Sequence, residues 1–231
     1  MDSQQITAEL STFLSAHQNP VDAPIMAGYM RNQFDFFGLK KPARQKLCKS
    51  FWETRTRPTL EELPSLVQAL WESPYRELQY HALDLMHQSI KKLSPSWLNL
   101  WEQLVVQKSW WDTVDYLAPR LIGAMLLKYP KHTIPYTKKW IESDNFWLQR
   151  VAIIFQLKYK DKTNQQILFD YILGRADSKE FFVQKASGWA LREYSKTNAE
   201  AVIHFTTSYQ DLLSPLTYRE ARKWMKKQDL I

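Results

Sequence analysis

The chain has 231 residues, of which 45% are hydrophobic and 24% charged, a balance typical of a folded globular protein rather than a disordered one. Lysine and arginine outnumber aspartate and glutamate by 31 to 24, and the resulting net charge of +7 suits a polyanionic partner. A single cysteine excludes an intrachain disulfide, no Cys and His spacing of a metal site occurs, and five glycines without a Gly-rich loop argue against a nucleotide; we expect neither a metal nor a cofactor.

The N-terminus lacks a basic segment followed by an apolar run, and nowhere do eighteen apolar residues follow one another. We therefore expect a soluble protein without a membrane partner. The lone cysteine, Cys48, fits a reducing, cytoplasmic location, and a monomer is expected.

Apolar residues recur at helical spacing along the chain, prolines stand between most of the periodic runs, and Asn-Gly or Asp-Gly hairpin signals are absent. This pattern predicts an all-α protein of antiparallel helix pairs joined by short loops. In chain order, helices are predicted over residues 6–18, 21–32, 41–52, 59–72, 75–93, 95–108, 111–129, 132–143, 145–160, 164–174, 179–196, 199–213 and 217–228.

An internal repeat of 35 residues relates four segments, which begin at Gln79, Val114, Gln149 and Gln184. The period is close to that of helix-pair solenoids, in which each unit buries its apolar face against its neighbours. Four helices of similar length could also produce this register without a true repeat.

The register places residues of successive repeats at equivalent positions, and side chains there should line one continuous surface. Two such positions carry notable side chains. One holds Asp115, Arg150 and Lys185, and the other holds Trp111, Phe146 and Phe181.

Residues 108–115 (KSWWDTVD) set two adjacent tryptophans beside two carboxylates at a predicted helix start. Trp111 and Asp115 lie one turn apart and share a helix face, so an indole and a carboxylate point into the same space. That combination suits a cationic ligand. The alternative is a buried Trp111 beside a solvated Asp115.

Cations gather on the last of the equivalent helices, where Lys185, Trp189, Arg192 and Lys196 share one face. Arg150 and Lys158, eight residues apart, are predicted to do likewise on the helix before. A basic groove with interleaved aromatic rings favours a nucleic-acid backbone, through phosphate contacts and stacking. A solvated charged face with half-buried Trp189 is the alternative.

Four segments together resemble the AlkD-like DNA alkylation repair proteins, alkylpurine DNA glycosylases built from HEAT-like helical repeats. The resemblance covers roughly residues 17–225. The segments are residues 29–34 (YMRNQF), 108–115 (KSWWDTVD), 143–150 (SDNFWLQR) and 181–194 (FFVQKASGWALREY).

The resemblance implies a single HEAT-like domain over residues 1–231, a right-handed α-solenoid of antiparallel helix pairs with a concave basic groove. It also implies a monofunctional glycosylase that removes cationic N3- and N7-alkylpurines, such as 3-methyladenine and 7-methylguanine, from double-stranded DNA without base flipping. By the same resemblance, Trp111, Asp115 and Trp189 match the catalytic pocket, Arg150 matches a groove arginine, and Tyr29 matches an aromatic near the cleft.

Lys158, Lys185 and Arg192 complete the predicted DNA-binding set, on the helix-face argument given above. Two other classes of function stay open. A non-enzymatic HEAT-like scaffold could recognise damaged or branched DNA, and a helical-repeat adaptor could bind proteins, although an adaptor would favour an apolar or acidic concave surface.

Overall fold

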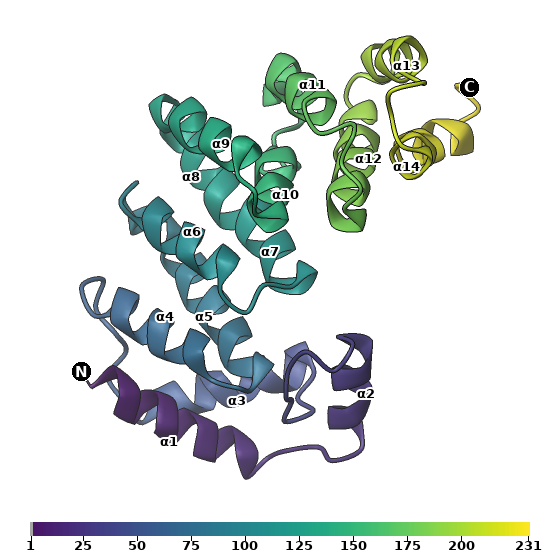
Figure 1. Cartoon of the computed structure of the whole chain (residues 1–231). Helices are drawn as coiled ribbons and strands as arrows, with labels where there is room; N and C mark the ends of the chain where they lie inside the picture. Colours follow the sequence, from purple (N-terminus) through teal and green to yellow (C-terminus); the bar gives the residue numbers. More distant parts are fainter. Residues whose placement is uncertain (1) are drawn as a thin grey trace. The chain divides into compact units, whose positions relative to one another are not determined.

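The computed structural model describes residues 2–231, and within them every regular element is a helix (Figure 1). The chain divides into two compact units, the first ending at Leu93 and the second running from Ser94 to Ile231. None of the helices in residues 2–231 has the length and apolarity to cross a membrane. The all-α fold of helix pairs is confirmed, while the hand of the solenoid, its basic groove and the single domain stay predictions.

The first unit contains six helical elements: α1 (Ser3–Ser15), α2 (Asp22–Tyr29), α3 (Lys41–Glu53), α4 (Leu63–Glu72), α5 (Arg76–Ser89) and the 3-10 turn η1 (Ile90–Lys92). The second contains α6 (Trp97–Val106), α7 (Trp111–Tyr116), the π-helical segment η2 (Leu117–Ile122), α8 (Gly123–Lys128), η3 (Pro130–His132), α9 (Thr133–Glu142), α10 (Phe146–Ile154), η4 (Lys160–Lys162), α11 (Gln165–Leu173), α12 (Phe181–Ser195), α13 (Ala199–Ser208) and α14 (Pro215–Lys227).

In the first unit, α1, α3, α4 and α5 bury a common apolar core. A buried ion pair joins two of these helices, because Arg44 on α3 donates to Asp84 on α5 at 2.8 Å. Next to it, the Trp52 indole donates to Nε2 of the buried His81 at 3.0 Å. Burial, together with two nearby arginines, lowers the pKa of His81 to about 3, so this imidazole is neutral and serves the core.

The 35-residue repeat is confirmed by where helices start and by a side-chain contact that recurs near their starts. Helices α5, α7, α10 and α12 begin at intervals of 35 residues. In three of the four repeats a glutamine side chain donates to the carbonyl oxygen of a serine six residues earlier, which ties the preceding loop to the helix. The pairs are Gln79 with Ser73 (3.0 Å), Gln149 with Ser143 (2.7 Å) and Gln184 with Ser178 (2.8 Å).

The repeat containing α7 departs from this pattern. Lys108 stands at the serine position with a positive φ of 47°, and Val114 stands at the glutamine position. Pro119, four residues after Asp115, has no N–H to donate to the Asp115 carbonyl, and its ring crowds that carbonyl. The helix therefore widens into the π-helical η2 before α8 resumes, so the predicted helix over 111–129 is present but interrupted.

Several predicted helices run past their observed ends; the one predicted over 199–213, for example, ends at Ser208 in α13. The helix predicted over 145–160 ends at Ile154 in α10 and is followed by turns. A tertiary contact explains the end: the Gln156 side chain accepts from the Asn164 backbone N–H at 2.7 Å and donates to the Asn164 carbonyl at 3.2 Å. These two hydrogen bonds hold the chain in a turn that leads to α11. A helix that continued past Ile154 could not make this turn.

Candidate functional site

Arg150 connects three helices of the second unit. Its Nε and Nη2 donate to the two carboxylate oxygens of Asp115 on α7, at 2.7 and 2.8 Å. Its Nη1 donates to the backbone carbonyl of Phe182 on α12, at 2.5 Å. A planar guanidinium matches a carboxylate in this two-point geometry, so the orientation of Asp115 is set as well as its charge.

The Asp115 carboxylate is largely buried yet accessible, with 19% of its side chain exposed, whereas the Arg150 side chain is 4% exposed. Burial raises the pKa of Asp115, while the hydrogen bonds and charge of Arg150 act in the opposite direction. The two hydrogen bonds from Arg150 use one acceptor position on each oxygen. A carboxylate has about four such positions, so each oxygen can accept one more donor.

An aromatic cluster lies beside this ion pair. The Trp110 ring packs against Trp147 and Phe182, with centroids 6.0 and 5.4 Å apart, and Trp147 packs on Phe182 at 4.7 Å. Trp110 therefore serves packing. The cluster fixes the start of α7 against α10 and α12, which holds Asp115 within reach of Arg150.

The two predicted catalytic tryptophans lie on α7 and α12. Trp111 is the first residue of α7, one turn before Asp115, and is half-buried. Trp189 is half-buried on α12, seven residues after Phe182, and two helical turns bring it onto the same face of α12 as Phe182. Each tryptophan is therefore partly exposed, Trp111 on the helix that carries Asp115 and Trp189 on the helix whose Phe182 carbonyl accepts from Arg150.

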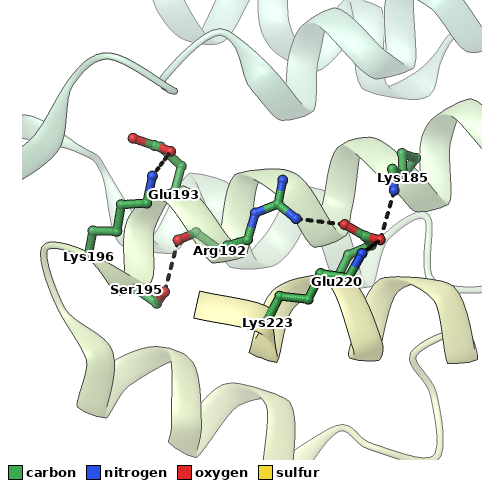
Figure 2. Close-up of polar contacts among 7 residues, drawn as sticks. All are labelled: Lys185, Arg192, Glu193, Ser195, Lys196, Glu220 and Lys223. Carbon is green, nitrogen blue, oxygen red and sulfur yellow. Dashed lines mark hydrogen bonds and ion pairs between the residues drawn. The ribbon is translucent and has the colours of Figure 1, made fainter. Parts of the chain in front are cut away.

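The predicted row of cations on α12 is organised by a carboxylate that sequence reasoning did not identify. Figure 2 shows Lys185 and Arg192 turned toward Glu220 of α14. The distances to the Glu220 oxygens are 2.7 Å from Lys185 Nζ and 2.6 Å from Arg192 Nη1, and Lys223 of α14 also contacts this carboxylate. Lys196 does not join them, because it pairs with Glu193 at 2.6 Å.

Gly188 allows α14 to lie close to α12. A Cβ atom at this position would lie 2.4 Å from Cβ of Glu220 and 2.9 Å from the carbonyl oxygen of Thr217, distances that no side chain tolerates. In addition, the Thr217 hydroxyl donates to the Gln184 carbonyl at 3.0 Å. The absence of a side chain at Gly188 thus brings Glu220 under the α12 cations.

Low pH should lower the free energy of unfolding because Glu220 becomes protonated. Burial acts to raise its pKa, but the hydrogen bonds and charges of Lys185 and Lys223 outweigh burial and lower the pKa from 4.5 to about 2. A carboxyl whose pKa is lower in the folded than in the unfolded state stabilises the fold above its unfolded pKa, and this contribution is lost as pH falls through the folded pKa. We expect the free energy of unfolding to fall between about pH 4.5 and 2 for this reason.

Urea unfolding followed by circular dichroism, repeated across that pH range, measures the effect. In Glu220→Gln the free energy of unfolding should fall less steeply at low pH, so that the acid limb of its plot against pH is flatter than in wild type. Glu142→Gln is the matched control, since it removes a carboxylate that is 64% exposed and should leave the limb unchanged. Identical acid limbs in wild type and Glu220→Gln would contradict the expectation.

Two predicted DNA-binding residues make none of the contacts described above. Lys158 is exposed in the turn after α10, so the helix-face argument that put it in line with Arg150 is wrong, because α10 ends at Ile154. Tyr29 is the last residue of α2 in the first unit, with 71% of its surface exposed. A DNA contact by either residue stays a prediction.

Three residues were missed by the sequence analysis: Phe182, Glu220 and Lys223. For Glu220 a signal existed, since it lies 35 residues after Lys185 and extends the series that runs from Asp115 through Arg150. Each of the two ion pairs, Asp115 with Arg150 and Lys185 with Glu220, thus joins equivalent positions of consecutive repeats.

Comparisons with known proteins agree on one family. The family model for the DNA alkylation repair enzyme matches residues 10–225. A solved structure from Enterococcus faecalis, described as a predicted DNA alkylation repair enzyme, is 36% identical, with a TM-score of 0.82, and the match covers 90% of this chain and 96% of that one. A comparison with curated proteins finds no match.

Proposed function

We propose, from the premise that the chain belongs to the DNA alkylation repair enzyme family, that it is a monofunctional DNA glycosylase. Its substrates would be cationic N3- and N7-alkylpurines in double-stranded DNA. The observation that carries the proposal is the Asp115 carboxylate, held in one orientation by Arg150 and one helical turn from Trp111. The enzyme is proposed to act as a monomer, without a metal or cofactor.

Alkylation at N3 or N7 leaves a positive charge on the purine, so the base departs readily. In the proposed reaction the bond between C1′ and N9 breaks, and its electron pair neutralises the leaving purine. Positive charge moves to the sugar as an oxocarbenium ion. Water then adds to C1′ and loses a proton to solvent through the carboxylate, which leaves a free neutral base and an abasic deoxyribose.

Asp115 is the residue proposed to act on this charge. A carboxylate already oriented in a partly buried site stabilises the oxocarbenium ion without reorganising during the reaction. Because Arg150 occupies only part of the acceptor capacity of Asp115, the remaining acceptor position on either oxygen can orient the attacking water.

Trp111 and Trp189 are proposed to present their ring faces to the cationic nucleotide. A cation over a tryptophan face gains about 0.5 to 2 kcal/mol, with the larger value when water is excluded. Both rings are half-buried on helix surfaces, which suits a duplex lying against the helices. We therefore propose that the base is not flipped into an enclosed pocket.

Duplex binding is assigned to phosphate contacts from Lys185, Arg192 and Lys158, with Tyr29 as an aromatic contact and Arg150 as a groove arginine. Phosphate contacts release counterions, so affinity for DNA should fall as salt rises. Affinity that does not weaken with salt would favour a protein-binding adaptor instead.

We expect the protein to release 7-methylguanine and 3-methyladenine from alkylated duplex DNA faster than these bases depart spontaneously. The physical reason is that Asp115 lowers the energy of the developing sugar cation. Base chromatography with folded enzyme in excess over lesions measures the release, and a bulky cationic N7 adduct in a second arm tests activity without base flipping.

Release at the spontaneous rate, combined with salt-sensitive DNA binding, would sink the glycosylase proposal and support the non-enzymatic DNA-binding scaffold. Asp115 favours the enzyme, because its carboxylate is 19% exposed and has acceptor positions beyond those that Arg150 uses, which a scaffold that reads only the backbone does not need.

A further inference from the structure

We infer that Glu220 is a positioning residue for duplex DNA: it holds Lys185, Arg192 and Lys223 as one preorganised site for a backbone phosphodiester. The site draws cations from two helices, α12 and α14, and adds Lys223 to the DNA-binding residues proposed above. This inference rests on the proposed function, since it names how a duplex would be held beside Trp189.

The geometry shows one anion serving three cations. The Glu220 side chain is 3% exposed, whereas the side chains of Lys185, Arg192 and Lys223 are 37%, 27% and 50% exposed. The carboxylate is therefore buried, whereas the cations reach the surface. A phosphate approaching from solvent would meet the cations and not the carboxylate.

Charge and hydrogen-bonding capacity leave room for an anion. Three cations around one carboxylate carry a net charge of +2. Each ammonium has three N–H donors and the guanidinium has five, and the pairing with Glu220 uses one from each group. The remaining donors come from side chains whose long stems are already held in place, so less rotamer freedom is lost on binding.

The position of the site along α12 links it to the proposed chemistry. Trp189 lies one turn after Lys185 and Arg192 lies three residues after Trp189, so the three share a face. Fixing a phosphate at the cations would hold the duplex in register against Trp189. Backbone contacts commonly set the register of a protein on DNA.

The variant Glu220→Gln tests the inference, because positioning of the cations and net charge alone predict opposite changes in its affinity for DNA. Removing the carboxylate raises the local charge by one unit, which by itself should strengthen DNA binding. If Glu220 positions the cations, however, the variant should bind undamaged duplex on the order of five-fold more weakly than wild type, because the three side chains lose their common anchor.

Binding of an undamaged duplex to the full-length protein, followed by fluorescence anisotropy across a salt series, is the experiment. Glu142→Gln provides the matched control, since it makes the same charge change at an exposed pair on α9. In excision assays with enzyme in excess, Glu220→Gln should raise the half-saturating concentration of folded enzyme and leave the single-turnover rate at saturation unchanged, a split that a loss of catalysis would not give.

Lys223→Gln keeps the test decisive if Glu220→Gln does not fold, because Lys223 is half exposed and leaves two cations on Glu220. It should reduce the salt slope by about 0.9, the value for one lost phosphate contact. Lys138→Gln, at the exposed pair with Glu142, should leave the slope unchanged.

Two results would overturn the inference: Glu220→Gln binding duplex as tightly as Glu142→Gln, or Lys223→Gln keeping the wild-type salt slope. Both are read on undamaged DNA and need no excision. Failure of the glycosylase proposal would therefore leave this test intact, and failure of this test would leave base release unaffected.

Discussion

Asp115→Asn should abolish most of the excision activity and leave DNA binding nearly intact. Asparagine keeps the shape of the side chain and removes the negative charge, so the oxocarbenium ion loses its counter-charge while the surface facing the duplex is unchanged. We expect the single-turnover rate to fall about 100- to 1,000-fold, equivalent to roughly 3 to 4 kcal/mol of transition-state stabilisation. Release of 7-methylguanine from a defined duplex, with enzyme saturating, measures this loss.

Asp170→Asn is the charge-matched control for this variant. It also removes a carboxylate from the second unit, but Asp170 is exposed on α11, where it accepts from Gln166. Any gain in binding from the added charge should be the same in both variants. A proportional loss of binding and turnover in Asp115→Asn would show that the carboxylate shapes the surface and does not act on the transition state.

The starts of most helices and the 35-residue register could be predicted from the sequence, because helical periodicity and repetition are local and additive signals; the helices predicted from residues 6 and 59 instead begin at Ser3 and Leu63. Trp111, Phe146 and Phe181 were placed at one repeat position, and each proves to be the first residue of its helix. The end of α10 could not be predicted in this way. It depends on the contact between Gln156 and Asn164, which periodicity does not encode.

The ion pair between Asp115 and Arg150 could be predicted from the sequence only in part. Placing Asp115 and Arg150 at one repeat position predicted that both line one surface, but not that they bond to each other. Equivalent positions of adjacent repeats lie close together in a solenoid, so opposite charges there should pair. Applied to Lys185, the same reasoning would have pointed 35 residues ahead to Glu220.

The consequence for Arg150 is a choice between two roles. The resemblance suggests that it contacts DNA, whereas the structure places its guanidinium between Asp115 and the Phe182 carbonyl, with a 4% exposed side chain. An arginine committed to those bonds acts on the reaction through Asp115. An arginine that also contacts a phosphate contributes directly to DNA binding.

Arg150→Met should separate these roles and produce the largest loss of stability of the changes considered. Methionine removes both hydrogen bonds to Asp115 and leaves a buried carboxylate without its cation, which costs about 3 to 5 kcal/mol in comparable pairs. Removing the cation also raises the pKa of Asp115, whose other charged neighbour, Asp112, acts in the same direction. Urea unfolding and the pH profile of single-turnover excision measure the two effects, and the acid limb of the profile should move to higher pH.

The double variant Asp115→Asn/Arg150→Met decides between the roles. If Arg150 acts through Asp115, the double variant should excise no more slowly than Asp115→Asn alone, and its loss of stability should be smaller than the sum of the single losses by about 1 to 3 kcal/mol. Arg150→Lys should be more active than Arg150→Met but less active than wild type, because an ammonium keeps the charge but lacks the planar fork of the guanidinium. Additive losses, together with weaker binding of undamaged duplex by Arg150→Met, would instead assign Arg150 to the DNA backbone.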